Sequence, residues 1–129
     1  MPTPGLNRRL DKLECSDECV VLIPFKFVIN GTSDPDGIEG SMIATVTRNE
    51  AGEFLGTLDC RPAKCIVGVA SVSNTADDVD MYAIVDWSTV ESAGTFVVRT
   101  MTGATQTDPT DNLLVGGYLL CLKSAKGWS

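Results

Sequence analysis

The sequence predicts an all-β protein: an antiparallel β-sandwich or barrel of about seven strands, preceded by a short N-terminal arm or helix. The first observation is that apolar residues alternate with a period of two over residues 19–29. The second is that further short segments of this kind follow at fairly regular spacing, separated by turns rich in Gly, Asp and Asn. The third is that no convincing long helical pattern accompanies them.

The overall composition indicates one globular domain. The chain has 129 residues, 43% hydrophobic and 21% charged, with a formal net charge of -7. We divide it into an arm, residues 1–18, and a β domain, residues 19–129. The acidic balance argues against nucleic acid as a partner, because binding to phosphates needs clustered Lys and Arg. The longest apolar run, residues 20–29, is interrupted by Pro24 and Lys26 and is too short for a membrane helix. We therefore expect no membrane partner and folding in a cytosol.

The arm combines apolar and basic side chains. Three leucines at helical spacing accompany three basic residues: Leu6, Leu10, Leu13, Arg8, Arg9 and Lys12. This pattern predicts a short amphipathic helix or an arm that orders on an acidic neighbour. A solvated helix face is the alternative interpretation.

The first strand, from residue 19 onward, has apolar residues on both faces. Residues 19, 21, 23, 25, 27 and 29 form one face, and the other includes Leu22 and Val28. Pro24 has no N–H for a ladder, so we expect a strand at the edge of a sheet. The second apolar face then requires a cover, either a neighbouring subunit or the N-terminal segment.

The rest of the domain divides into strands and turns. A polar loop is expected at residues 30–40, and a hairpin at 42–47 and 53–58 closed by Gly52. Residues 64–73 are apolar on both faces, which predicts a central strand. Further strands are expected at 79–87, 95–101 and 114–123, the last with a bend or bulge at Gly116 and Gly117.

The five cysteines are Cys15, Cys19, Cys60, Cys65 and Cys121. In a cytosol they stay reduced, and Cys19 and Cys121 fall in apolar strand patterns, so we expect mostly buried free thiols. The C-x3-C and C-x4-C spacings depart from the usual zinc pattern. A zinc site and a late disulfide remain open as alternatives.

No set of residues able to catalyse a reaction is found. The chain has no histidine, which removes Ser-His and Cys-His nucleophile pairs. Carboxylates remain in two groups, Asp77, Asp78 and Asp80 near one strand and Asp34, Asp36, Asp108 and Asp111 in loops. They are read as turn and surface residues, with a loop calcium site as a minority interpretation. We expect no enzyme activity, no catalytic residue, no metal and no cofactor.

Three segments carry a resemblance to a known class of proteins. They are TRNEAGEF at residues 47–54, GTFVVRT at 94–100 and TDPTDN at 107–112, followed by the apolar LLVGGYLLCL. In this order, over residues 44–122, they resemble small virion structural proteins of tailed bacteriophages. The resemblance implies a capsid decoration, or cement, protein: a small β domain that self-associates, often as a trimer, and stabilises the shell without chemistry.

The resemblance implies the major capsid protein and further copies of the chain as partners, and the virion capsid as the location. The expected partner-binding residues are Leu6, Arg8, Arg9, Leu10, Lys12, Leu13, Leu22 and Val28. An alternative places the protein in a tail, neck or fibre as a receptor- or glycan-binding module using Trp87, Tyr82 and Trp128. Trp87 lies in phase with Met81 and Val85, which favours core packing for it. A carboxylate- or metal-dependent enzyme is a third hypothesis.

Overall fold

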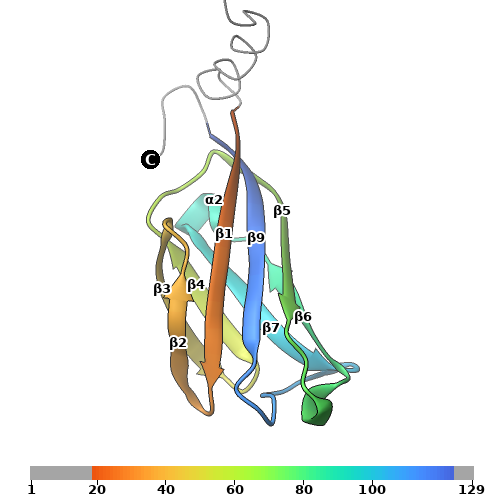
Figure 1. Ribbon diagram of the computed structural model, residues 1–129. Helices are drawn as coiled ribbons and strands as arrows, with labels where there is room; N and C mark the ends of the chain where they lie inside the picture. The colour runs from red at the N-terminus through yellow and green to blue at the C-terminus, as the bar shows by residue number, and fades with distance from the viewer. Residues whose placement is uncertain (1–18, 124–129) are drawn as a thin grey trace, which may run out of the picture.

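A computed structural model describes residues 19–123 of the chain, and the domain is a β-sandwich of two antiparallel sheets (Figure 1). Sheet A has the order β2-β1-β9-β5, and sheet B has the order β3-β4-β7-β6 with β8 paired to β7. Sheet A consists of β1 (Cys19–Asn30), β2 (Ser33–Glu39), β5 (Lys64–Val72) and β9 (Leu114–Lys123). Sheet B consists of β3 (Ile43–Glu50), β4 (Glu53–Leu58), β6 (Met81–Asp86), β7 (Thr95–Thr102) and β8 (Thr105–Gln106). The predicted all-β class is confirmed, and the two sheets do not close into a barrel.

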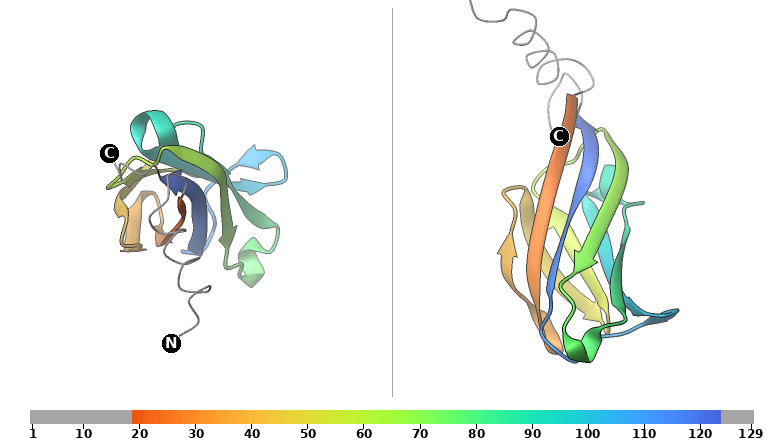
Figure 2. Two further views of the ribbon diagram at one scale, coloured as in Figure 1. Left: turned by 90° about the horizontal axis from the view of Figure 1, so that it is seen from above. Right: turned by 45° about the vertical axis from the view of Figure 1, so that its right-hand side comes forward.

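The core lies between the two sheets, as the view from above shows (Figure 2). From β1 it takes Ile23, Phe25, Phe27 and Ile29, which confirms the predicted inner face of that strand. Two aromatic pairs join the sheets: the ring centroids of Phe25 and Phe96 are 4.8 Å apart, and those of Phe27 and Phe54 are 5.4 Å apart. Such tilted pairs stabilise the core beyond the area that they bury.

The prediction that the first strand lies at a sheet edge is wrong for β1 as a whole. Residues 30–40, expected as a loop, contain β2, which returns along the second half of β1 with partners at Lys26, Val28 and Asn30. Turn-forming residues hid β2 from the sequence prediction. One of them, Gly37, has a φ of 56° and lies where the register with β1 is irregular. Pro24 lies just beyond the last of these partners, so its missing N–H disturbs no pairing with β2.

Two further strand predictions are wrong. β5 is an edge strand of sheet A, not a central one. Its apolar pattern was misleading because a bulge between Cys65 and Val67 changes which face the residues occupy. Gly116 and Gly117 continue a regular register with β1 and form no bulge. Gly117 instead permits close packing, since a Cβ there would lie 2.0 Å from the carbonyl oxygen of Val69.

The remaining predicted strands are confirmed within one to three residues, including the hairpin of β3 and β4 with Gly52 at φ 73°. The described helices are short: the 3-10 helix η1 (Ala76–Asp78) and α2 (Val90–Ala93). Among residues 19–123, no helix has the length and hydropathy that a membrane crossing would need.

Candidate functional site

The most distinctive surface is the outer face of sheet A, which faces the viewer in Figure 1. Ladder pairing places Leu22 opposite Leu120 and Val20 opposite Leu122, and directly opposed residues share a face. The side chains on the other side of the same strands, such as Leu119 and Cys121, are buried in the core. We define the apolar face by the outward side chains of β1, β5 and β9: Val20, Leu22, Val28, Val67, Val69, Leu114, Tyr118, Leu120 and Leu122.

Several side chains of the apolar face are strongly exposed. Val20 is 51% exposed and Leu22 is 54% exposed, while Leu114, Tyr118 and Val69 are also open to solvent. A contiguous exposed apolar patch of this kind is typical of an interaction surface, whereas single exposed apolar residues need no explanation. The surface therefore favours binding to another apolar surface.

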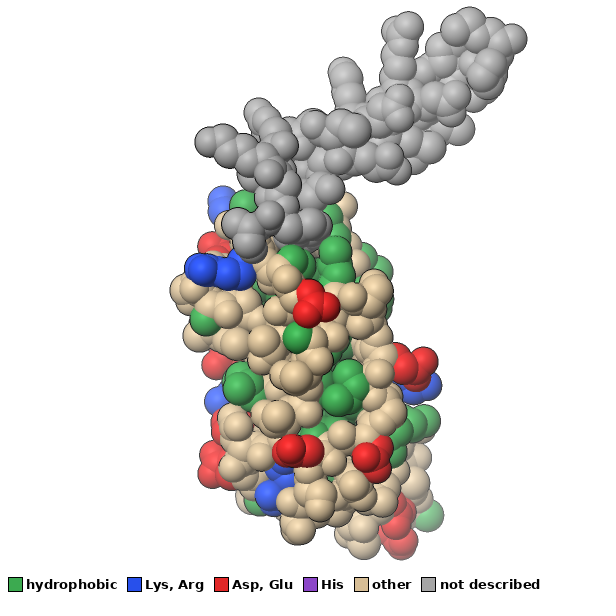
Figure 3. Space-filling model, turned by 90° about the vertical axis from the view of Figure 1, so that its left-hand side faces the viewer, with side chains coloured by type: hydrophobic (Ala, Val, Ile, Leu, Met, Phe, Trp, Pro, Cys, Tyr) green, Lys and Arg blue, Asp and Glu red, His purple; other side chains and the backbone are tan. Residues whose placement is uncertain are grey.

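Charge is sparse on this face although the whole chain is acidic. Of the described side chains on β1, β5 and β9, the charged ones are Lys26 and Lys64, and no carboxylate is among them. Lys26 contacts Glu39 of β2 at 3.6 Å at the margin. The side of β2 and β3, by contrast, presents mostly neutral atoms with separate acidic and basic side chains (Figure 3). The sparse charge of the apolar face resembles the centre of a protein interface, which is depleted in charged residues.

A shallow hollow interrupts the apolar face where Gly116 has no side chain. It has a volume of about 290 Å³, and its lining includes Lys26, Ser71, Leu114 and Gly116. A Cβ at Gly116 would meet only the carbonyl oxygen of Phe25, at 3.8 Å. The hollow can accept a protruding side chain from a partner.

Two of the predicted partner-binding residues lie in the described part of the chain. The structure places Leu22 and Val28 together on the apolar face, and Val28 is half-buried beside β2. The other six residues lie outside the described part of the chain: Leu6, Arg8, Arg9, Leu10, Lys12 and Leu13. Sequence reasoning missed the contributions of β5 and β9, because they depend on pairing between distant segments. The apolar second face of residues 114–122 was the available signal.

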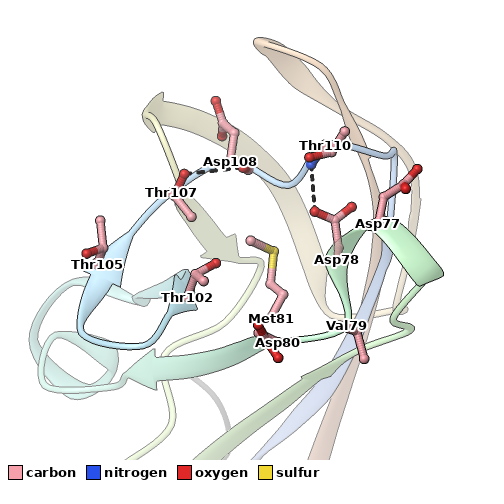
Figure 4. Close-up of a pocket in the computed structure, with 10 residues that line it drawn as sticks. All are labelled: Asp77, Asp78, Val79, Asp80, Met81, Thr102, Thr105, Thr107, Asp108 and Thr110. Carbon is pink, nitrogen blue, oxygen red and sulfur yellow. Dashed lines mark hydrogen bonds between the residues drawn. The ribbon is translucent and has the colours of Figure 1, made fainter.

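A second hollow, about 450 Å³, lies at the opposite end of the sandwich from the start of β1 and is lined mainly by aspartates and threonines (Figure 4). Asp78 accepts hydrogen bonds from the backbone N–H groups of Thr110 and Asp111, both at 2.8 Å. The bond from Thr110 contributes most to a pKa of Asp78 below its usual value. These bonds fold residues 110–111 onto η1, so Asp78 has a structural role.

Asp108 is also held within the fold. Its carboxylate accepts a hydrogen bond from Arg48 at 2.6 Å and from the N–H of Gly52 at 2.8 Å. The TRN and TDPTDN segments are therefore in direct contact, although 60 residues separate Arg48 from Asp108. Residues 19–123 contain no group of three or more Cys, Asp or Glu side chains placed to hold a metal ion. The loop carboxylates of residues 34, 36, 108 and 111 therefore form no metal-binding group with one another.

The described cysteine side chains are free thiols: Cys60, Cys65 and Cys121. Burial is the main reason why the pKa of each is raised. The pKa of Cys121 rises to about 12, with the neighbouring Cys65 as a further cause. Cys65 and Cys121 are opposite each other on β5 and β9 and are buried. Thiols with raised pKa values are protonated at neutral pH, which disfavours nucleophilic attack. The zinc hypothesis also involves Cys15 and the side chain of Cys19, which lie outside the described part.

Trp87 does not pack in the core as its phase predicted. It is 37% exposed and lines a groove of about 360 Å³ with Val69, Ile84 and Val85, where β5 meets β6. The strand ends at Asp86, so the alternation that predicted burial no longer applies at residue 87. Tyr82 is exposed on β6, and Trp128 lies outside the described residues.

Comparisons of the chain with protein-family models, with curated proteins and with solved structures give no match.

Proposed function

We propose that the protein is a non-enzymatic virion structural protein that decorates and stabilises the capsid of a tailed phage. The observation that carries the proposal is the apolar face, a broad sheet surface with sparse charge and several strongly exposed side chains. The segments that resemble phage virion proteins supply the class of particle. The partners are the major capsid protein and further copies of the chain, which assemble in the host cytoplasm.

The apolar face supports this function through a physical mechanism that requires no reaction. A face of this kind stabilises a complex when a neighbouring surface removes its side chains from water. On a shell the same contact is repeated by symmetry, so a modest interface at each copy stabilises the whole particle. The two motif segments have an indirect role in this proposal, because the ion pair of Arg48 with Asp108 holds the TDPTDN segment against β3.

The direct test is to add purified full-length protein to phage particles that lack it. We expect saturable binding at a fixed ratio to coat subunits and an increase in the temperature at which the particles release DNA. Serum albumin added at the same concentration is the control. Absence of binding to particles at saturating protein concentration would contradict the proposal.

The predicted arm can be tested in the same assay. Deletion of residues 1–14 is expected to abolish particle binding and to leave the thermal unfolding of the β domain unchanged, because the described core uses residues from β1 onward. Unchanged binding of the deletion variant would remove the arm from the interface and leave the apolar face as the contact.

A second candidate function is receptor or glycan binding in a tail or fibre, and the exposure of Trp87 favours it. An exposed indole beside a groove is a suitable platform for stacking on a sugar ring. Copy number separates the two functions: a decoration protein is present in a fixed ratio to coat subunits, and a tail protein in a few copies per particle. Trp87→Ala should abolish binding to host glycans in the second case and leave particle binding unchanged in the first.

A further inference from the structure

The first half of β1 has an unpaired edge within the described part of the chain. β1 pairs with β9 from Cys19 to Val28, but its partners in β2 begin only at Lys26. In the right-hand view of Figure 2, β1 extends well beyond β2. The two lateral edges of the sandwich are covered, unlike this part of β1. β2 contacts β3, and β5 contacts β6 with Gly68 against Val85.

Within residues 19–123, no strand pairs with the backbone groups at this edge. The N–H of Ile29 donates to the carbonyl oxygen of Leu113, on the side of β9, at 2.9 Å. Because successive N–H groups of a strand point to opposite sides, those of Val20 and Leu22 point to the open edge. Pro24 has no N–H on this edge, and Gly40 lies against its carbonyl oxygen. The available edge therefore extends from Val20 to Leu22 and ends at Pro24.

Among the described residues, this edge has few of the features that prevent pairing between proteins. Natural sheets protect exposed edges with charged side chains, proline, bulges or a covering segment, and here Pro24 closes the open stretch at one end. Residues 20–25 carry no charge, and the register with β9 is regular there. Val20 and Leu22 also belong to the apolar face, so a strand added at this edge would extend that face.

We propose that a second copy of this chain pairs with the edge, antiparallel and about a two-fold axis, so that the two A sheets form one continuous sheet. The N–H of Val20 would donate to the carbonyl of the partner subunit's Leu22, and the N–H of Leu22 to the carbonyl of the partner subunit's Val20. The inference rests on the proposed function, to which it adds the contact for self-association. A second copy fits because the edge offers equal donors and acceptors, which a two-fold axis matches to themselves. The same axis places the two apolar faces side by side.

The test measures backbone amide exchange by NMR in the full-length protein over a range of concentrations that spans self-association. Exchange at Val20 and Leu22 should slow by about tenfold or more as the dimer forms, because both amides become hydrogen-bonded. Exchange at Val21 and Ile23 should stay slow throughout, because these amides already face β9. Exchange at Val20 and Leu22 that does not change while the protein dimerises would overturn the proposal, as would a monomer at every concentration.

A pair of variants separates this inference from the proposed function. Leu22→Lys places a charge at the edge and should weaken dimerisation by about tenfold or more in sedimentation experiments. Leu120→Lys changes the opposite residue on β9, which is away from the edge, and should change dimerisation less than about threefold. Equal weakening by both variants would assign self-association to the face and overturn the edge contact. Loss of particle binding with the dimer intact would contradict the decoration function alone.

Discussion

The outer faces of the two sheets both contain apolar side chains but differ in the charges that accompany them. On sheet B, Arg99 contacts Glu53 at 3.1 Å and Asp86 at 3.7 Å, and Ile84 lies opposite Arg99 on the next strand. Threonines fill much of the remaining face, at positions 45, 47, 57 and 95. On sheet A, the described side chains of β1, β5 and β9 form no ion pair with one another. We call the surface around Arg99 the charge-paired face.

The difference indicates which face is suited to remain in water. Covering the charge-paired face would remove three charged groups from solvent, which is costly unless the partner replaces their hydration. Covering the apolar face removes mainly hydrocarbon from water, which is favourable. Sheet A is therefore better suited to docking and sheet B to exposure to solvent, and the following predictions test this proposal.

The largest expected effect concerns the two adjacent glycines of β9. Gly117→Ala should destabilise the fold by about 3 kcal/mol or more, because the added Cβ would lie 2.0 Å from the Val69 carbonyl oxygen, which belongs to the backbone. Gly116→Ala should change stability by less than about 1 kcal/mol, because its Cβ would lie on the open side. Chemical denaturation measures both variants.

The same pair of glycines also tests the docking face. Gly116→Ala partly fills the hollow beside Lys26 and Leu114, so we expect weaker particle binding by a fully stable protein. Similar losses of stability in the two variants would show that the outer side of sheet A is packed rather than open, and would contradict the comparison.

The second prediction substitutes one matched apolar residue on each face. Leu114 on the apolar face is 41% exposed, and Ile84 on the charge-paired face is 43% exposed. Leu114→Asp should weaken particle binding by about 100-fold, since a carboxylate would be buried without a partner. Ile84→Asp should leave binding within about threefold of the wild type, because its side chain stays in water. Binding titrations with particles measure both, and a larger loss for Ile84→Asp would reverse the assignment of the faces.

The parts of the fold that follow a local pattern could be predicted from the sequence. The alternation of apolar residues identified the inner face of β1, and a positive-φ glycine identified the β3–β4 hairpin. β2 was missed because Asp, Pro and Gly in residues 33–39 are typical of a loop. β2 nevertheless pairs with β1, and it also contacts β3, where the N–H of Arg48 donates to the carboxylate of Asp34 at 2.9 Å. Local composition does not contain that contact.

The candidate site could be predicted only in part, for a related reason. Leu22 was identified because it shares a strand with the core residues of β1. Leu114, Tyr118 and Leu120 join it only because β9 pairs with β1 across about 90 residues of sequence, and periodicity does not specify which strands pair. The structural role of the TDPTDN segment was also beyond local reasoning, since its partners are Arg48 and Asp78.

The third prediction compares an ion pair on each sheet. Arg99→Ala should destabilise the fold by about 1 kcal/mol, because the partly buried carboxylate of Glu53 loses its cation. Lys26→Ala should cost less than about 0.5 kcal/mol, because Lys26 and Glu39 are more exposed and 3.6 Å apart. Urea denaturation measures the free energy of unfolding of both variants. If Lys26→Ala were the more destabilising, the apolar face would depend on charge as much as the charge-paired face does.

The smallest expected effect is a loss of stability at acidic pH, caused by carboxylates that lie outside the apolar face. The pKa values of Asp78 and Asp86 are lowered from 3.8, chiefly by hydrogen bonds from Thr110 and Ser88 respectively. A carboxylate whose pKa is lower in the folded state stabilises the fold above its unfolded value and loses that contribution as the pH falls through the folded value. Stability should therefore be constant near neutral pH and decrease below about pH 4.

Urea denaturation at a series of pH values measures this decrease, and Asp78→Asn and Asp86→Asn identify its source. Each variant should be less stable than the wild type at pH 7 and should lose less stability on acidification, because the asparagine does not titrate. The described strands of the apolar face carry no carboxylate, so dimerisation between pH 7 and pH 5 should stay within about twofold of its neutral value. A strong change in dimerisation over that interval would place a titrating group at the contact, and would contradict an interface made of apolar side chains and backbone hydrogen bonds.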